Sequence, residues 1–176
     1  MKPTKRILLF LLFASITINN VFAEWQKVNE LFLGEGRGNA YTNRSIEINS
    51  KTDKIYISHT ITPNITEYDS ETMSILERIN LNILPKDIKI DSKENKLYIS
   101  DSGHPQYAAI CIIDGYTNNI INSNTYPKEI DNWDYGNDSF IVDFELKRIF
   151  IGMRLRDRDS DKIAYYLTVV DATTLE

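Results

Sequence analysis

The stretch Lys54-Ile55-Tyr56-Ile57-Ser58 recurs as Lys96-Leu97-Tyr98-Ile99-Ser100, and a third version reads Arg148-Ile149-Phe150-Ile151-Gly152. In each copy a basic residue leads into an apolar run with an aromatic residue at its centre. Such β-prone runs suit strands that are covered on both faces. The recurrence marks an internal repeat, and this repeat governs the expected fold.

A second signature follows each copy at some distance. It reads Asp-x-x-Thr directly after an apolar or aromatic residue, at positions 69–72, 114–117 and 171–174. Asp and Thr side chains hydrogen-bond nearby backbone groups, so this spacing favours a hairpin turn. The two signatures recur in the same order and predict repeats over about residues 39–82, 83–127 and 128–176, the last one incomplete.

Turn residues separate short β-prone runs within each repeat, as an antiparallel meander requires. Residues 24–33 read as one further strand, although helical spacing also fits their apolar positions. Four-strand repeats of about 40 to 45 residues are typical of β-propeller blades. We expect strands at 45–49, 54–60, 65–69 and 75–81, then at 87–91, 96–100, 107–114 and 120–126, and then at 139–144, 148–155 and 163–171.

The pattern apolar-x-Tyr-Ile-Ser followed by apolar-Asp-x-x-Thr resembles the YVTN family of β-propeller repeats. The family's Tyr-Val-x-Asn core corresponds to residues 56–58 and 98–100, and its Asp-x-x-Thr segment to residues 68–72 and 113–117. The third repeat departs from the pattern with Phe150 and Gly152. The resemblance covers about residues 45–176 and implies an all-β fold of antiparallel four-stranded blades in an extracytoplasmic protein.

Closed propellers have roughly four to eight blades, whereas this sequence supplies about three. We therefore expect a partial propeller or one that is closed by oligomerisation. In a homo-oligomer, residues 24–33 of one copy could complete the last blade of another. A truncated gene product explains the missing fourth strand as simply.

The chain has 176 residues, a net charge of −5 and 42% hydrophobic residues, which suits one globular domain. Its acidic balance argues against a general nucleic-acid binder. Three positive residues within the first six, an apolar run over 7–18 and Ala23 predict a signal peptide over residues 1–23. We expect residues 24–176 to be a periplasmic, secreted or cell-surface domain without a stable transmembrane segment; an uncleaved anchor is the alternative.

The connections after the second and fourth strands of each repeat vary most in length, and both lie on one face of a blade. Loops that vary on a repeated scaffold often carry binding residues, although unconstrained drift also explains such variation. The candidate binding residues on this loop face are His59, Asp101, His104, Trp133, Tyr135 and Arg154.

The two histidines and the aromatic pair each have a structural alternative. His59 and His104 could together bind zinc or transfer protons, but a protein zinc site needs at least three ligands, so ordinary loop histidines remain an alternative. Trp133 and Tyr135 lie in a polar segment and suit stacking on a sugar or a peptide side chain. Trp133 could equally fill the gap between two blades.

The acids Asp157, Asp159 and Asp161 alternate as at the start of a calcium loop, but the glycine and glutamate of that loop are missing. A solvent-exposed charged hairpin explains them as well. Cys111 is the single cysteine and falls in an apolar run, so we expect a small buried residue. The sequence has no nucleophile elbow, HExxH, Walker loop or CxxC motif, and predicts no catalytic residue and no cofactor.

These observations favour a non-catalytic binding or scaffold module whose partner is a protein or a small ligand. The main alternative is a propeller subunit of an extracytoplasmic enzyme, resembling the non-cofactor subunit of a quinone-linked dehydrogenase or a metal-assisted hydrolase. The resemblance is specific for architecture and identifies no ligand.

Overall fold

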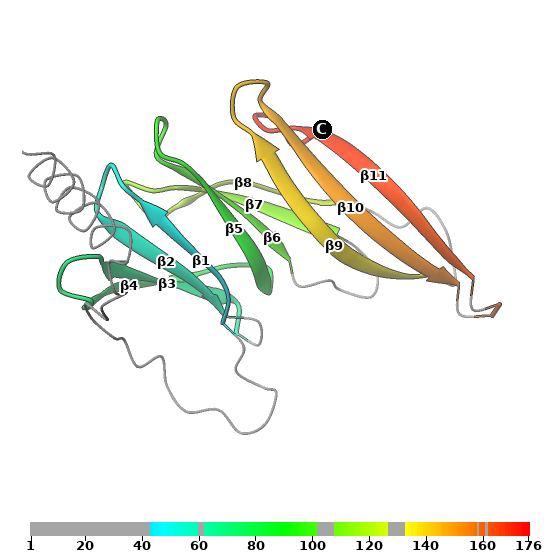
Figure 1. The fold of residues 1–176 in the computed structure, drawn as a ribbon, viewed down its shortest axis with the longest axis horizontal. Helices are drawn as coiled ribbons and strands as arrows, with labels where there is room; N and C mark the ends of the chain where they lie inside the picture. The colour runs from blue at the N-terminus through cyan, green and yellow to red at the C-terminus, as the bar shows by residue number, and fades with distance from the viewer. Residues whose placement is uncertain (1–42, 60–61, 102–107, 127–132, 158, 161) are drawn as a thin grey trace, which may run out of the picture. The chain divides into compact units, whose positions relative to one another are not determined.

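A computed structural model describes residues 43–59, 62–101, 108–126, 133–157, 159–160 and 162–176, all within one compact unit of the chain. Eleven strands in this part of the chain form three antiparallel sheets, two with four strands and one with three (Figure 1). Each sheet is a meander in which neighbours in sequence are neighbours in space. Among the described residues, no helix has the length and apolar character needed to cross a membrane.

The three sheets follow the three repeats in order. The first contains β1 (Asn43–Asn49), β2 (Lys54–His59), β3 (Asn64–Asp69) and β4 (Ile75–Asn80). The second contains β5 (Pro85–Asp91), β6 (Lys96–Asp101), β7 (Ala108–Asp114) and β8 (Ile120–Tyr126). The third contains β9 (Trp133–Asp143), β10 (Arg148–Asp157) and β11 (Ile163–Asp171).

The eleven strands predicted for the three repeats are all present, and most bounds agree within one or two residues. The third repeat is the exception. Its first strand, expected over 139–144, begins at Trp133, and its second strand continues to Asp157 instead of ending at 155. A β-bulge opposite Gly152 and Met153 lets the two strands resume pairing and stay in register to their ends. The predicted strand over residues 24–33 lies outside the described residues.

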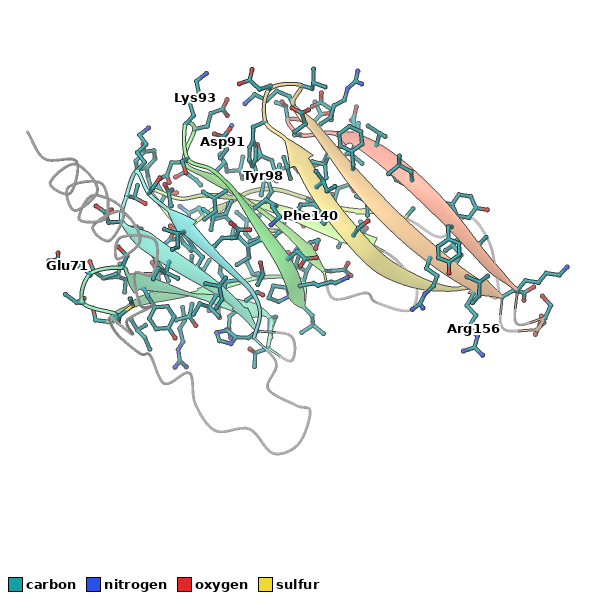
Figure 2. The ribbon with its side chains drawn as sticks, in the orientation of Figure 1. Glu71, Asp91, Lys93, Tyr98, Phe140 and Arg156 are labelled. Carbon is teal, nitrogen blue, oxygen red and sulfur yellow. The ribbon has the colours of Figure 1, made fainter. Side chains whose placement is uncertain are left out.

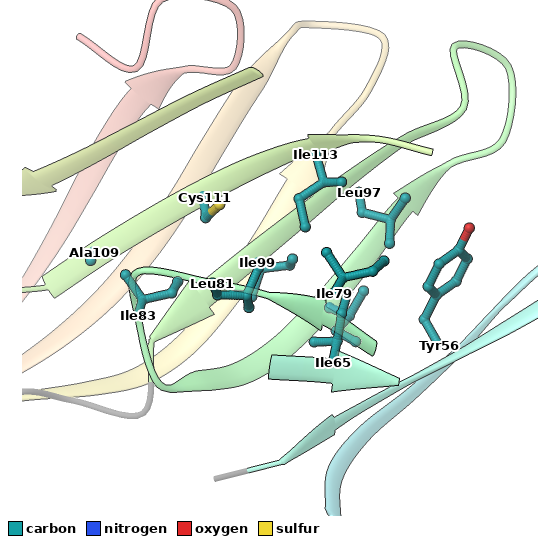
Figure 3. Packing of buried hydrophobic residues seen from close by; sticks show 11 residues of the cluster. Tyr56, Ile65, Ile79, Leu81, Ile83, Leu97, Ile99, Ala109, Cys111 and Ile113 are labelled. Carbon is teal, nitrogen blue, oxygen red and sulfur yellow. The ribbon is translucent and has the colours of Figure 1, made fainter. Parts of the chain in front are cut away.

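The first hydrophobic core lies between the first and second sheets (Figure 3). Side chains alternate between the two faces of a strand, so the odd-numbered and even-numbered residues of a strand pack against different neighbours. Tyr56 and Ile65 of the first sheet pack with Leu97 and Ile99 of the second. Cys111 is buried in the same cluster, and burial raises the pKa of its thiol to about 12. The prediction of a small buried cysteine is confirmed.

The second core lies between the second and third sheets. Tyr98 and Ile112 of the second sheet pack with Phe140, Ile149 and Val170 of the third; Figure 2 labels Tyr98 and Phe140. Tyr98 therefore repeats the position of Tyr56, one sheet further along the chain. The second sheet is thus buried on both faces, which explains its nearly continuous apolar sequence.

Each Asp-x-x-Thr signature builds the same turn after the third strand of its sheet. The Asp69 carboxylate accepts hydrogen bonds from the backbone N–H groups of Glu71 and Thr72, at 3.1 and 2.7 Å. Asp114 and Asp171 accept the equivalent two bonds in the second and third sheets. The residue after each threonine has a positive φ of 57° to 60°. The predicted turn is therefore present in all three repeats, and it closes a hairpin in the first two.

This turn is bonded to the turn between the first two strands of the same sheet. The backbone N–H of Ser70 donates to the carbonyl oxygen of Asp53 at 2.9 Å, and Gly115 donates to Asn95 at 2.8 Å. Ala172 donates to Lys147 at 2.9 Å in the third sheet. The three acceptor residues have φ values of 52° to 54°. One backbone hydrogen bond thus joins these two turns in every sheet.

The third repeat replaces the serine of the first two repeats by Gly152 for a steric reason. In the first sheet the Ser58 hydroxyl accepts a hydrogen bond from the Ser45 backbone N–H at 3.0 Å and donates to the Lys86 carbonyl at 2.8 Å. In the third sheet the hydroxyl of Ser139, opposite Gly152, occupies the place where a β-carbon would stand. The departure from the repeat pattern therefore fits the same strand geometry.

A buried carboxylate joins the first sheet to the second. The Glu67 side chain, 1% exposed, forms an ion pair with Lys54 and accepts a hydrogen bond from the Asn118 side-chain amide at 2.6 Å. Glu67 stands beside Tyr56 in the strand register. Burial, and then the Glu67 charge, raises the pKa of the Tyr56 hydroxyl. The basic residue that leads this repeat thus compensates a buried charge.

Truncation of the repeated tyrosines tests the packing of the two cores. Tyr56→Ala and Tyr98→Ala should each lower the free energy of unfolding by about 3 to 5 kcal/mol, since both rings are buried between sheets. Tyr56→Phe is the matched control. The Tyr56 hydroxyl has no hydrogen-bond partner among the described residues, so its removal should cost nothing or stabilise the protein. Urea unfolding measures all three, and a loss of less than about half a kcal/mol for either alanine variant would contradict this packing.

The turns also predict how stability depends on pH. Backbone hydrogen bonds, led in each case by that of the threonine, hold the pKa values of Asp69, Asp114 and Asp171 below their usual range. A carboxyl with a lowered folded pKa stabilises the protein above its unfolded pKa of about 4, and this contribution is lost as pH falls through the folded value. The thermal unfolding temperature should therefore drop in strongly acidic buffer.

The control for this acid sensitivity is the triple variant in which all three residues are changed from Asp to Asn. Asparagine keeps an oxygen that accepts the same backbone hydrogen bonds but does not titrate. The triple variant should show a shallower fall of unfolding temperature between about pH 5 and about pH 2. An unchanged pH profile would show that these carboxylates contribute no pH dependence.

Candidate functional site

The end of the third sheet that carries the β10–β11 hairpin extends beyond the repeat pattern (Figure 1). The strands β9, β10 and β11 have 11, 10 and 9 residues, against 6 or 7 in each strand of the other two sheets. The additional residues of β10 are 154–157, and the pairing of residues 153–156 with 163–166 joins this end of β10 to β11. We call this part the hairpin extension.

The hairpin extension exposes basic and aromatic side chains on two regularly paired strands, β10 and β11. Arg154 is exposed and stands directly opposite Tyr165, which is 73% exposed. Tyr166 is also exposed, on the other face and opposite Met153. Arg156 is exposed at the end of the strand, where Figure 2 labels it. The extension therefore exposes arginine and tyrosine side chains on regularly paired strands.

The turn that closes the hairpin extension uses Asp157 as its cap. The Asp157 carboxylate accepts hydrogen bonds from the Ser160 hydroxyl and, at 2.9 Å, from the Asp159 backbone N–H. These bonds, with that of Ser160 the largest, hold the pKa of Asp157 below its usual range. The Asp157 backbone N–H in turn donates to the Lys162 carbonyl at 2.9 Å. The carboxylate is thus part of a well-bonded turn.

The calcium hypothesis for this turn stays a prediction. Asp157 and Asp159 are close in the turn, but Asp161 lies outside the described residues. Over the described ranges, no group of three or more His, Cys, Asp or Glu side chains is placed to hold a metal ion.

His59 ends β2 and is half-buried against its own sheet. Its Nε2 atom lies 2.8 Å from the Thr66 hydroxyl on the neighbouring strand β3. Burial, and then the nearby Arg78 charge, lowers the pKa of the imidazole. His59 is therefore engaged in a hydrogen bond within its own sheet. The other member of the predicted pair, His104, lies outside the described residues, so the pair remains a prediction.

Asp101 stands at the position in β6 that His59 occupies in β2. Each is paired, across a β-bulge, with the first residue of the preceding strand, Pro85 or Asn43. The Asp101 side chain is buried, with 2% exposure. Asp101 is therefore not an exposed binding residue.

The aromatic residues Trp133 and Tyr135, expected in a polar loop, lie in a strand instead. Both belong to β9, where Trp133 is in register with Asp157 and Tyr135 with Leu155. The backbone pairing with β10 continues through this polar segment because β10 itself is long. Their side chains lie outside the described part of the structure, so the predicted stacking role remains a prediction.

Two sets of exposed residues have no counterpart in the sequence predictions. The first is the Tyr165 and Tyr166 pair on the hairpin extension. The second is an apolar set on the outward face of the third sheet, formed by Ile141, Leu167 and Val169. Leu167 and Val169 are exposed although the equivalent residues of the second sheet, Ile110 and Ile112, are buried. Nothing in the local sequence pattern signals that these residues are exposed.

No family model matches the chain, and no curated protein matches it by sequence. Solved structures do match. The chain is similar to Kuenenia stuttgartiensis hydrazine synthase, with a TM-score of 0.52 and 8% identity, over 83% of this chain and 40% of that one. It is also similar to a chain in the crystal structure of a nidogen/laminin complex, with a TM-score of 0.45 and 12% identity, over 72% of this chain and 48% of that one.

These likenesses bear on the fold alone. The described part of the chain is all-β, and its three antiparallel sheets resemble the blades of a β-propeller, in line with the match at a TM-score of 0.52. The predicted fold class is therefore confirmed. The chain spans less than half the length of either similar chain.

Proposed function

We propose that this chain is a YVTN-type β-propeller repeat protein that acts outside the cytoplasm as a non-catalytic binding and scaffold module. The observation that carries the binding role is the hairpin extension, where Arg154, Tyr165 and Tyr166 are exposed on long, regularly paired strands. Exposed residues on a rigid scaffold bind without first having to be ordered, which favours affinity.

The chemistry of the hairpin extension favours an acidic protein segment as the ligand. Arginine and tyrosine are enriched at the energetic centres of protein interfaces, because each combines a large contact area with hydrogen-bonding groups. Arg154 and Arg156 supply positive charge on one strand, and Arg154 stands opposite Tyr165 on the other strand. An extended peptide that carries carboxylates beside aromatic or aliphatic residues would complement both.

The membership in the YVTN type is supported by the turn geometry of the repeats. The Asp-x-x-Thr turn and its bond to the preceding hairpin are the same in all three sheets, including the third, whose strand departs from the motif. The repeat therefore extends to the end of the described residues as one structural unit.

The extracytoplasmic location rests on the charged, apolar and small-residue segments at positions 1–23. We expect the mature protein to begin at or near Glu24, which N-terminal sequencing of the exported protein would show. Recovery of protein with an intact Met1 from the soluble cytoplasmic fraction would contradict export.

The binding role can be tested with a random peptide library displayed on phage. The immobilised mature protein should enrich peptides that carry acidic and aromatic residues. A variant with Arg154→Ala, Tyr165→Ala and Tyr166→Ala should bind the selected peptides at least about tenfold more weakly, because interface arginines and tyrosines dominate binding energies.

The matched control is Tyr116→Ala, which removes an exposed tyrosine from the turn between β7 and β8. This variant should bind the selected peptides as the unchanged protein does. A library without enrichment, or selected peptides that bind the triple variant undiminished, would refute the hairpin extension as the binding site.

A further inference from the structure

The outward face of the third sheet repeats a face that is buried in the other two sheets. Val169 pairs with Phe150 in the strand register, as Ile112 pairs with Tyr98 in the second sheet. Leu167 pairs with Gly152, as Ile110 pairs with Ser100. Ile110 and Ile112 are 0% and 3% exposed, whereas Leu167 and Val169 are 68% and 48% exposed. We call the set Ile141, Phe150, Leu167 and Val169 the third-sheet face.

The opposite face of the first sheet shows the complementary deviation. Ile46 pairs with Ile57, as Ile88 pairs with Ile99 in the second sheet. Ile88 is fully buried, whereas Ile46 and its neighbour Ile48 are 58% and 59% exposed. The β1 side of this sheet is therefore open, while Ile57 beside it is buried. We call the pair Ile46 and Ile48 the first-sheet face.

We propose that the third-sheet face docks on the first-sheet face of a second copy of this chain, head to tail. The chain itself supplies the template, because the same two kinds of face already meet twice within it. In each contact, the face that carries the central tyrosine packs on the face of the next sheet that carries the isoleucine or phenylalanine of its first strand. The first contact surrounds Tyr56, and the second surrounds Tyr98. A second copy continues this contact around Phe150. The proposal goes beyond the proposed function, since it uses a different surface.

The rim of the internal interfaces supports the choice of a second copy. At the first interface, Glu67 meets Asn118 of the next sheet, a polar pair. At the second interface, the equivalent positions hold Ile112 and Leu175, an apolar pair in one buried cluster. In the head-to-tail contact the equivalent positions hold Val169 and Met73 of the second copy, which is again an apolar pair. In all three interfaces, the two side chains at these equivalent positions therefore have matching polarity.

One rim position does not match, and it offers a sharper test. At the first interface the Asn49 side chain donates to Asn95 of the next sheet, at 2.5 Å. At the second, Asp91 lies 3.6 Å from the ammonium group of Lys147. The head-to-tail contact would place Asp143 against Asp53 of the second copy, two like charges that weaken association. Asp53→Lys restores the charge pattern of the second interface. Lys147, the equivalent residue of the third sheet, has nearly the same positive φ as Asp53, so the backbone accommodates a lysine there.

Two copies joined in this way combine six sheets in sequence, which is within the range of roughly four to eight blades found in closed propellers. A head-to-tail contact is heterologous, so it closes into a ring only when the rotation per sheet fits the number of sheets. A closed dimer contains the contact twice and leaves neither face exposed. Contiguous exposed apolar faces of this kind mark interaction sites in soluble proteins.

Sedimentation velocity of the mature protein over a concentration series tests the proposal. The protein should form a dimer. The pair Leu167→Lys and Val169→Lys, and separately the pair Ile46→Lys and Ile48→Lys, should each raise the dissociation constant at least about tenfold, because both contacts of the dimer lose apolar burial. Asp53→Lys should lower the dissociation constant. Ile120→Lys, at an exposed position of β8, is the matched control and should change nothing.

A mixture of the two paired variants separates this arrangement from its rivals. Each mixed dimer retains one intact contact, between the unchanged third-sheet face and the unchanged first-sheet face, so mixing should partly restore association. Circular dichroism of each variant should show the same folded signal, because all four positions are exposed. A monomer at every concentration would overturn the proposal, as would association that depends on Leu167 and Val169 but not on Ile46 and Ile48.

Discussion

The single backbone hydrogen bond between the two hairpin turns of each sheet is the constraint on which the rest of the structure depends. Its donor follows the turn aspartate and its acceptor is the residue with positive φ that precedes the second strand, as in Ser70 and Asp53. The bond fixes the register of the first, second and third strands at once. A slip by one residue would exchange the two faces of a strand, so this register decides which side chains enter which core. Gly115 shows how tight the contact is, since a β-carbon there would lie 2.9 Å from the Asn95 carbonyl oxygen.

Given this register, the cores follow from alternation. The tyrosine of one repeat and the isoleucines that flank it point to opposite faces, so each sheet contributes one aromatic layer and one aliphatic layer. Tyr98 contacts the third sheet, whereas Leu97 and Ile99 contact the first. The third sheet keeps the same bond, through Ala172 and Lys147, although its motif reads Phe150 and Gly152. Its outward face therefore has the same strand register as the packed faces of the other two sheets.

The local signals of the sequence predict most of the fold. Short β-prone runs, Asp-x-x-Thr turns and the tyrosine positions all rest on contacts within a few residues or on the repeat itself, and the structure confirms them. The hairpin extension could not be predicted in the same way. Its polar segment around Trp133 forms a strand because β10 is long enough to pair with it, and this pairing across a β-bulge leaves no local mark in the sequence. The binding candidates separate along the same line. Arg154 lies on the extension and is exposed. His59 and Asp101 lie at the ends of regular strands, where His59 is half-buried and hydrogen-bonded and Asp101 is buried.

Comparison of equivalent positions between repeats gives more information on function than the presence of the repeat itself. A sheet between two others packs on both faces, so the residues of each face must match those of the sheet that they contact. Glu67 is tolerated in a buried site because Lys54 and Asn118 surround it, and the next repeat replaces the carboxylate by Ile112 where Leu175 provides an apolar neighbour. Val169 continues this apolar choice at a position where the described residues of the same chain supply no third neighbour. Val169 is 48% exposed, and an exposed apolar side chain beside others of its kind is typical of an interaction surface.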